Sequence, residues 1–451
     1  MLKRKLALVP VALAGLVLWL YSAPSFADSQ ARIVRLSSVD GNVQIDRNTG
    51  QGFERAFLNL PVTQGVKLRI KGEGRAEVEF EDGSTLRLAS DTEVEFPQLA
   101  LLESGSKTSS VNLAAGTAYV NFAGAKNDQL TLTFGREKLD FNRPAHLRVE
   151  LARIDAAVAV FKGDVQLETS TGTLALGKNQ TANFDFRKDD KCEVAKNINP
   201  NPFDEWDKEQ EKYHQRYTIA SNNYSPFAYG SSDMAYYGNF FNAPGYGMMW
   251  QPYFAGAGWD PFMDGAWAFS PGMGYGWVSA YPWGWTPYHY GSWMFLPGHG
   301  WAWQPGGAWS AFAAVPRVVN PPHNFVMPQA PTGAGRSTIV VNRGPVSTPA
   351  GHSANKLVVR NNSAGLGIPR GSVDHLTKVS ESVQQGGQVT TKIHSAPVMN
   401  PPSRSSSAAS SSSGNRGRAQ PTSGSNSAGP RAMPSPSPGS RVGAGPARPG
   451  R

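Results

Sequence analysis

Apolar and polar residues alternate in short runs along residues 31–187, and turn residues separate the runs. In residues 75–88 the apolar side chains fall at every second position on both sides of Asp82 and Gly83. A strand with this alternation has one apolar face and one charged face. An Asp-Gly pair is a strong hairpin signal, because glycine accepts the positive φ of a type I′ turn. About a dozen such runs, without alternating helices, predict a mainly β domain built as an antiparallel roll or sandwich or as a solenoid.

A short helix is expected at residues 200–220. Pro202 suits the first helical position and Asn201 the N-cap. Aromatic residues recur near helical spacing along this segment, at Trp206, Tyr213 and Tyr217. The pattern predicts a connector helix that docks through one apolar stripe.

Residues 221–315 contain an aromatic repeat whose units start at Gly238, Gly265 and Gly291, 27 and 26 residues apart. Each unit has two short aromatic runs around a Pro-Gly pair, which predicts two strands joined by a turn. From Tyr217 through Pro316 the chain has no Lys or Arg. The acids of this stretch are Asp233, Asp260 and Asp264.

Residues 316–451 are rich in Pro, Ser, Gly and Arg, which predicts a low-complexity and mostly disordered tail. Two apolar runs, at residues 338–341 and 357–359, are expected to pair as strands or to dock on the folded part. Beyond Asn400 we expect disorder.

The N-terminus has the pattern of a signal peptide at residues 1–27. A basic cluster at residues 3–5 precedes an apolar run at residues 6–21, and Ser25 and Ala27 supply the small residues of a cleavage site after Ala27. The alternative is an uncleaved anchor, but the apolar run is shorter than the ~20 residues that span a bilayer. The protein is therefore expected to be exported, to the periplasm or to the cell surface and extracellular space.

The net charge of +9 is concentrated in the tail, where fifteen Lys and Arg face two Asp and Glu from Pro316 onward. Two alternatives follow for this basic tail: contact with anionic envelope polymers, or an inert soluble extension. Export makes nucleic acid an unsuitable partner. Cys192 is the single cysteine, and its polar neighbours predict an exposed thiol without a role.

Several apolar positions follow the order Val39-x-Gly41-x-Val43 and Ala76-x-Val78-x-Phe80-x-Asp82-Gly83-Ser84-x-Leu86-x-Leu88. With Val158-x-Val160-x-x-Gly163-x-Val165, this order resembles the FecR domain, the periplasmic β-rich part of iron-uptake signalling regulators. The resemblance covers about Val34 to Phe186. The anti-sigma segment of those regulators is not found before the basic cluster, and Leu147-Arg148-Val149-Glu150 stands where they have a Gly-Thr pair. The resemblance therefore implies the fold but not sigma-factor regulation.

The aromatic repeat is similar to a Trp/Tyr/Gly-rich module of unknown function that follows FecR-like domains in exported bacterial proteins. The similarity covers about Phe203 to Val315, and its most specific piece is the run at residues 282–293, Pro-Trp-Gly-Trp-x-Pro-Tyr-His-Tyr-Gly-x-Trp. It implies no known activity.

Catalytic motifs are missing: there is no Gly-x-Ser-x-Gly elbow, His-Glu-x-x-His helix or phosphate loop. Glu79 and Glu81 could form a glycosidase pair, but strand alternation predicts that they lie on a solvated face. His289 and His299 could bind a metal with Asp264; stacking on aromatic rings and bonding to the backbone is the favoured interpretation. No catalytic residue, metal or cofactor is predicted, and the protein is expected not to be an enzyme.

Six aromatic side chains of the repeat are candidates for stacking on sugar rings: Trp267, Trp277, Trp293, Trp301, Tyr288 and Tyr290. The alternative, favoured for most of them, is that they form the core of a module poor in aliphatic residues. The leading hypothesis is a non-enzymatic envelope binding or structural protein whose partner is a protein or a glycan. A periplasmic signal-sensing protein of FecR type is the second hypothesis, and an envelope glycan hydrolase the third and least supported.

Overall fold

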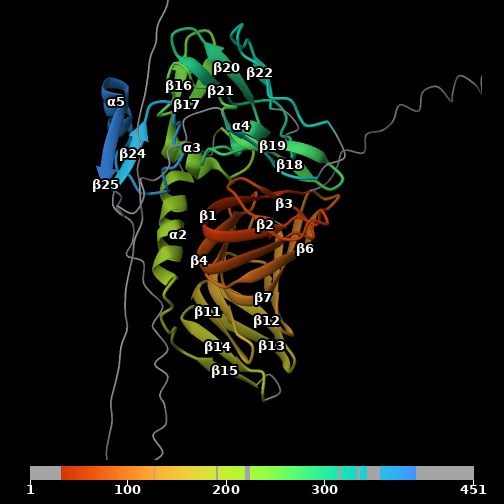
Figure 1. Ribbon diagram of the computed structural model, residues 1–451. Coiled ribbons are helices and arrows are strands. Elements are labelled where there is room, and N and C mark those ends of the chain that lie inside the picture. Colours follow the sequence, from red (N-terminus) through yellow and green to blue (C-terminus); the bar gives the residue numbers. More distant parts are fainter. Residues whose placement is uncertain are drawn as a thin grey trace, which may run out of the picture. The chain divides into compact units, whose positions relative to one another are not determined.

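The computed structural model describes residues 32–125, 127–188, 191–218, 224–312, 316–332, 336–342 and 356–392. The expected signal peptide, its cleavage at Ala27 and the disorder expected beyond Asn400 lie outside these residues. The described chain belongs to one compact unit and is mainly β, as predicted (Figure 1). In this part of the chain we find no helix with the length and apolarity needed to cross a bilayer.

Fifteen strands form the sheet of the N-terminal β domain: β1 (Val34–Asp46), β2 (Glu54–Arg55), β3 (Pro61–Val62), β4 (Lys67–Glu79), β5 (Thr85–Leu88), β6 (Glu93–Leu101), β7 (Lys107–Phe122), β8 (Gln129–Phe134), β9 (Glu137–Phe141), β10 (Ala145–Leu151), β11 (Asp155–Lys162), β12 (Asp164–Thr169), β13 (Gly172–Gly177), β14 (Gln180–Asp185) and β15 (Lys191–Ala195). The long strand β7 joins them, because it pairs with β5, β6, β8 and β10. All these pairings are antiparallel except that of β7 with β8. The alternating apolar residues meet inside the domain in one core cluster.

The hairpin predicted around Asp82 and Gly83 is confirmed as β4–β5, with Val78 opposite Leu86. Its turn is not type I′, because Gly83 is left-handed (φ +87°) and Asp82 is not. The Gly83 amide donates to the Phe80 carbonyl, and the Phe80 amide to the Ser84 carbonyl. This is a three-residue loop with a single left-handed glycine at its end.

Helix α2 (Asp204–Thr218) follows the β domain, as the sequence predicted. The Asn201 side chain accepts a hydrogen bond from the Phe203 amide (2.9 Å), and Asp204 accepts one from the Asn201 amide (2.8 Å). This reciprocal pairing makes Asn201 a cap of the first turn, as predicted, but α2 itself begins at Asp204 rather than at Pro202.

The aromatic module contains α3 (Ser231–Tyr237), β16 (Gly238–Ala243), β17 (Gly247–Pro252), β18 (Asp264–Ser270), β19 (Gly274–Ser279), α4 (Thr286–His289), β20 (Ser292–Leu296), β21 (Gly300–Gln304) and β22 (Val318–Val319). The three predicted hairpins are confirmed as β16–β17, β18–β19 and β20–β21. In each hairpin the first glycine leaves room for an indole ring twelve residues later in the sequence. A Cβ at Gly238, Gly265 or Gly291 would lie 2.4–2.6 Å from an atom of Trp250, Trp277 or Trp303, respectively.

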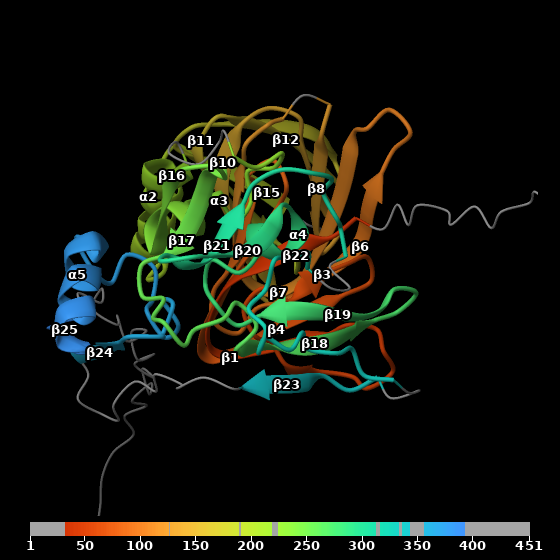
Figure 2. The same ribbon diagram turned by 90° about the horizontal axis from the view of Figure 1, so that it is seen from above.

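The first and third hairpins pair with each other through β17 and β21, where Trp250 lies opposite Trp303. Gln251 Nε2 donates to the His299 carbonyl and Gln304 Nε2 to the Tyr246 carbonyl, both at 2.7 Å. These contacts are reciprocal, so the two repeat units are related by an approximate twofold axis. The second hairpin instead pairs with β23 (Ile339–Asn342), and the three strands lie together in Figure 2.

Part of the segment predicted to be a disordered tail is folded. Residues 356–392, called the strap below, form β24 (Lys356–Arg360), α5 (Leu376–Gly386) and β25 (Gln388–Lys392). The two apolar runs of the tail are strands, but each has a different partner: β23 pairs with β18, and β24 with β25. The strap is ordered because it buries Leu357, Ala364 and Ile368 in the core of the aromatic module.

Candidate functional site

The acidic residues at the end of β4 and in the turn after it are buried rather than solvated, which corrects the prediction for Glu79 and Glu81. Glu77, Glu79 and Glu81 leave 0%, 2% and 6% of their surface exposed. Strand alternation assigned the right face, but a single sequence did not show what covers it. Helices α2 and α3 and the strap supply partners to this face.

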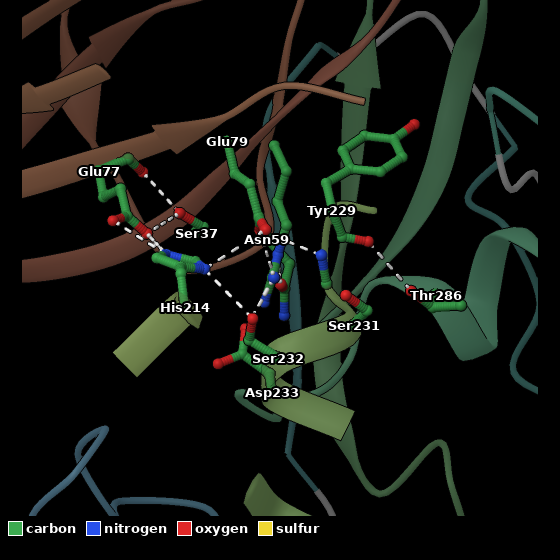
Figure 3. A network of polar contacts seen from close by, with 12 residues as sticks. Ser37, Asn59, Glu77, Glu79, His214, Tyr229, Ser231, Ser232, Asp233 and Thr286 are labelled. Atoms are coloured by element: carbon green, nitrogen blue, oxygen red, sulfur yellow. Dashed lines mark hydrogen bonds and ion pairs between the residues drawn. The ribbon is translucent and has the colours of Figure 1, made fainter. Parts of the chain in front are cut away.

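Glu77 lies at the centre of a buried ion network (Figure 3). It accepts hydrogen bonds from Arg87 Nε (2.8 Å), Ser37 Oγ (2.7 Å) and Arg370 Nη1 (2.5 Å), and His214 Nε2 lies 3.0 Å away. Burial raises the pKa of the Glu77 carboxyl, but the charges of His214, Arg370 and Arg87 outweigh it and hold that pKa well below its usual value. Glu77 is therefore an anion that pairs with three elements at once.

Asp233, at the start of α3, is the second anion of the network. Arg35 Nη1 bridges it to Glu79, at 2.7 and 3.0 Å. Arg370 donates two hydrogen bonds to Asp233, both at 2.9 Å, and Tyr213 Oη donates a third at 2.8 Å. Burial raises the pKa of Asp233, and the charges of Arg370 and Arg35 lower it further than burial raises it.

Helix α2 docks through buried charges in addition to part of the predicted apolar stripe. Its buried Asp207 contacts Arg87 Nη1 (2.7 Å) and His146 Nε2 (2.8 Å). Its Glu211 lies 3.3 Å from His146 Nδ1 and 2.6 Å from Lys162 Nζ. Of the predicted stripe, Tyr213 and Tyr217 pack on the Tyr236 ring, with centroids 5.4 and 5.2 Å away. Trp206 is partly exposed.

The β domain also satisfies backbone carbonyls of the aromatic module. Asn59 Nδ2 donates to the Ser279 and Tyr281 carbonyls, at 3.0 and 2.8 Å. Arg35 Nη2 donates to the Pro282 carbonyl at 2.7 Å. The second repeat unit is thereby fixed to the β domain next to the ion network.

This arrangement is suited to holding segments together, because each carboxylate at its centre faces at least one cation in a water-poor setting. Buried charges of this kind depend on their partners, and removal of one partner leaves an uncompensated charge. The network therefore couples β1, β4, β5, α2, α3 and the strap.

Five of the six aromatic candidates for sugar stacking are buried. The exposed fractions of Trp267, Trp277, Trp293, Trp301 and Tyr288 are 4% or less, and Tyr290 is partly buried. Their placement corresponds to the alternative that they form the core of the module. A ligand-binding role of these residues stays a prediction.

His289 and His299 each stack on a different aromatic ring. His289 is buried and stacks on Trp309 with 5.5 Å between the ring centroids, and its Nδ1 lies 2.9 Å from the Ser310 carbonyl. Exposed His299 stacks on Phe241 at 5.8 Å. Asp264 accepts a hydrogen bond from Tyr281 instead. Within the described ranges, His, Cys, Asp and Glu form no group of three that could hold a metal ion.

Cys192 differs from its expected exposed position, because it is half-buried in β15 opposite Phe184. Burial raises the pKa of its thiol, and the nearby carboxylates of Glu137 and Glu193 raise it further. The thiol is therefore less reactive than an ordinary exposed one.

Sequence reasoning did not single out Arg35, Arg87, His214 or Arg370. One signal was present: Asp233 lies in a stretch without any Lys or Arg, so a buried Asp233 needs a cation from elsewhere in the chain. The pattern did not identify that cation, because Arg370 lies in a segment whose composition predicts disorder.

Comparison with known proteins identifies two domains. Residues 66–166 match the FecR protein family, and residues 231–327 match a family of unknown function, DUF6600. Both resemblances seen in the sequence are thus confirmed, and the chain carries a FecR domain followed by a DUF6600 domain.

No curated protein matches the chain. Two crystal structures of a proposed anti-sigma factor from Parabacteroides distasonis ATCC 8503 are similar at 13% identity, with a TM-score of 0.25. The match covers 29% of this chain and 59% of theirs, so the chain spans about three fifths of that protein.

Proposed function

We propose that this protein is a non-enzymatic sensing or binding protein of FecR type in the bacterial envelope, which recognises a protein or glycan partner. The observation that carries the proposal is the buried ion network between the FecR domain and the aromatic module. Because its charges are shared between the two, a partner bound to one alters the stability of the other. This is the physical requirement for a sensing domain that passes a signal within its own chain.

The exposed side chains at the hairpin turns of the aromatic module are the proposed contact surface. Tyr246 and Met248 are 40% and 38% exposed, and exposed His299 lies on the neighbouring turn. An uncharged surface with an exposed tyrosine suits stacking on a neutral sugar or packing against a protein. The basic tail is proposed to add a salt-sensitive contact with anionic envelope polymers.

Export to the periplasm or cell surface is part of the proposal, and rests on the signal-peptide pattern together with the FecR domain. N-terminal sequencing of the exported protein tests it. An N-terminus at Asp28 supports a released envelope protein, whereas an intact N-terminus favours a membrane-anchored sensor.

Co-sedimentation with purified sacculi, outer-membrane vesicles and envelope polysaccharide tests the binding. The protein starting at Asp28 is compared with one ending at Asn400, which keeps the strap, at low and high salt. Binding that resists salt and survives removal of the tail, but is lost in Tyr246→Ala, supports recognition by the aromatic module. Binding that disappears with the tail contradicts it. No binding to any of the three contradicts a glycan partner and leaves a protein partner, which cross-linking in cells then tests.

A further inference from the structure

The strap lies on the aromatic module in the manner of a bound peptide. Its strands β24 and β25 pair only with each other among the described residues, so no sheet of the body continues into it. Aromatic side chains of the module donate instead to its backbone carbonyls: Trp283 Nε1 to Ala364 (2.6 Å), Tyr237 Oη to Ile368 (2.6 Å) and Tyr236 Oη to Val373 (3.1 Å). A segment held in this way, without joining a sheet, resembles a peptide bound in an aromatic-lined groove.

Small and aliphatic side chains of the strap fill the spaces between these donors. Ala364, Ile368 and Val373 are 0%, 4% and 3% exposed. Gly365 has a φ of +87°, and a Cβ there would lie 3.0 Å from the Tyr237 ring. This stretch of the strap therefore follows the aromatic surface closely.

Arg370 is the anchor of the strap. Its side chain is 8% exposed and reaches Asp233 with two hydrogen bonds and Glu77 with one. Its guanidinium also lies 5.2 Å from the Tyr213 ring centroid. Two carboxylates and an aromatic ring form a pocket that fits a planar guanidinium and does not fit the smaller, rounder charge of a lysine.

We propose that the junction of the FecR domain and the aromatic module is a binding site for an arginine-bearing peptide, and that residues 361–374 occupy this site as a resident ligand of the same chain. The aromatic donors bind the peptide backbone with little dependence on sequence, and the Asp233–Glu77 pocket selects the arginine. The site is distinct from the turn surface proposed above for envelope partners, so either proposal can fail without the other.

The test separates the strap from the body without removing it. A protease site is inserted between residues 343 and 355 of the full chain, outside the described residues, and the protein is cut after folding. The C-terminal fragment is then held only by non-covalent contacts. Its exchange is followed by fluorescence polarisation with a labelled synthetic peptide of residues 356–392, while tryptophan emission and circular dichroism report the fold of the body.

In the cut protein we expect the labelled peptide to replace the resident fragment while the body stays folded, whereas the uncut protein binds no peptide. An Arg370→Ala peptide should bind about 100-fold more weakly, because it leaves two buried carboxylates without their partner. An Arg370→Lys peptide should bind with an affinity between those of the original peptide and the Arg370→Ala peptide. An Arg360→Ala peptide is the matched control, since Arg360 is exposed, and it should bind like the original.

Three results would overturn the proposal. The first is that the fragment does not exchange after cutting, and the second is that the body unfolds when the fragment leaves. Either result would show that the strap is part of the core and not a ligand. Equal binding of the Arg370→Ala and Arg360→Ala peptides would show that the pocket does not select arginine.

Discussion

Among single residues, Glu77 connects the largest number of elements in the ion network, because its carboxylate contacts Arg87 on β5, His214 on α2 and Arg370 in the strap. We expect Glu77→Gln to lower the free energy of unfolding by about 3–5 kcal/mol, since it leaves buried cations without their anion. Urea unfolding followed by circular dichroism measures this change.

The matched control for Glu77→Gln is Glu73→Gln on the same strand, where the side chain is exposed. That change should alter the free energy of unfolding by less than about 0.5 kcal/mol. Similar values for the two variants would show that the network contributes no more than a surface charge.

His289 makes the stability depend on pH in a range where few side chains titrate. Burial lowers the pKa of this imidazole to about 4, from 6.5. Below pH 6.5 the unfolded chain therefore takes up a proton that the folded chain does not, and stability falls as the pH drops toward 4. We expect a loss of about 1.4 kcal/mol per pH unit over most of that window.

Unfolding of the wild type, His289→Gln and His299→Gln at pH 7.5, 6 and 5 tests this prediction. The His289→Gln variant should show a flatter dependence of stability on pH than the wild type, and the exposed His299→Gln variant is the surface control. Identical slopes for all three proteins would contradict it. Below pH 5 the carboxyls of Glu77, Asp207 and Asp233 add a further loss, because their pKa values lie below the usual ones and their stabilising charge disappears on protonation.

At the scale of elements, the hairpins of the aromatic module depend on close packing between a glycine and a tryptophan. A Cβ at Gly265 would lie 2.4 Å from Trp277 Cζ2 and 2.7 Å from the Val278 carbonyl oxygen. We expect Gly265→Ala to cost about 2–3 kcal/mol through overpacking. Gly258→Ala is the control, because its Cβ would meet only one atom, 3.9 Å away. A Gly265→Ala protein as stable as this control would contradict the prediction.

The sequence was sufficient to predict the three hairpins, because each carries its own Pro-Gly turn and its own aromatic runs. It was not sufficient to predict how they pair. Gln251 and Gln304 occupy the same place in the first and third repeat units, where the second unit has Val278. A glutamine at this place marks the two units that pair with each other, and a valine marks the unit that contacts the β domain. The sequence alone does not show this, because the role of the glutamines follows from their reciprocal contacts in the structure.

At the scale of the whole chain, local patterns predicted strands and turns correctly and failed where the partner is distant in sequence. The β4 face looked solvated because its partners His214 and Arg370 lie 137 and 293 residues beyond Glu77. Composition of the tail predicted disorder because a few buried positions, such as Ala364 and Ile368, are diluted among polar residues. Both errors concern the same site, which forms only when the three segments meet.

The ion network predicts that the FecR domain and the aromatic module unfold together. The chain offers a separate probe for each: Cys192 lies in the FecR domain, while ten tryptophans lie between Trp250 and Trp309 and none lies between residues 32 and 195. If one domain unfolds alone, charges of the folded domain lose their partners: Arg35 and Glu77 on the FecR side, or Asp233 on the side of the aromatic module. These charges would stay partly shielded from water, so a state with one domain unfolded is costly.

In a urea titration at pH 8, the reactivity of the Cys192 thiol and the red shift of tryptophan emission should therefore have the same midpoint. A Cys192→Ser protein checks that the tryptophan curve does not depend on the thiol reagent. In Arg370→Ala both midpoints should fall together, because Arg370 pairs with Glu77 of one domain and Asp233 of the other. Two separate midpoints in the wild type would mean that the network joins the domains without coupling their stability, and that a signal bound to one could not reach the other through it.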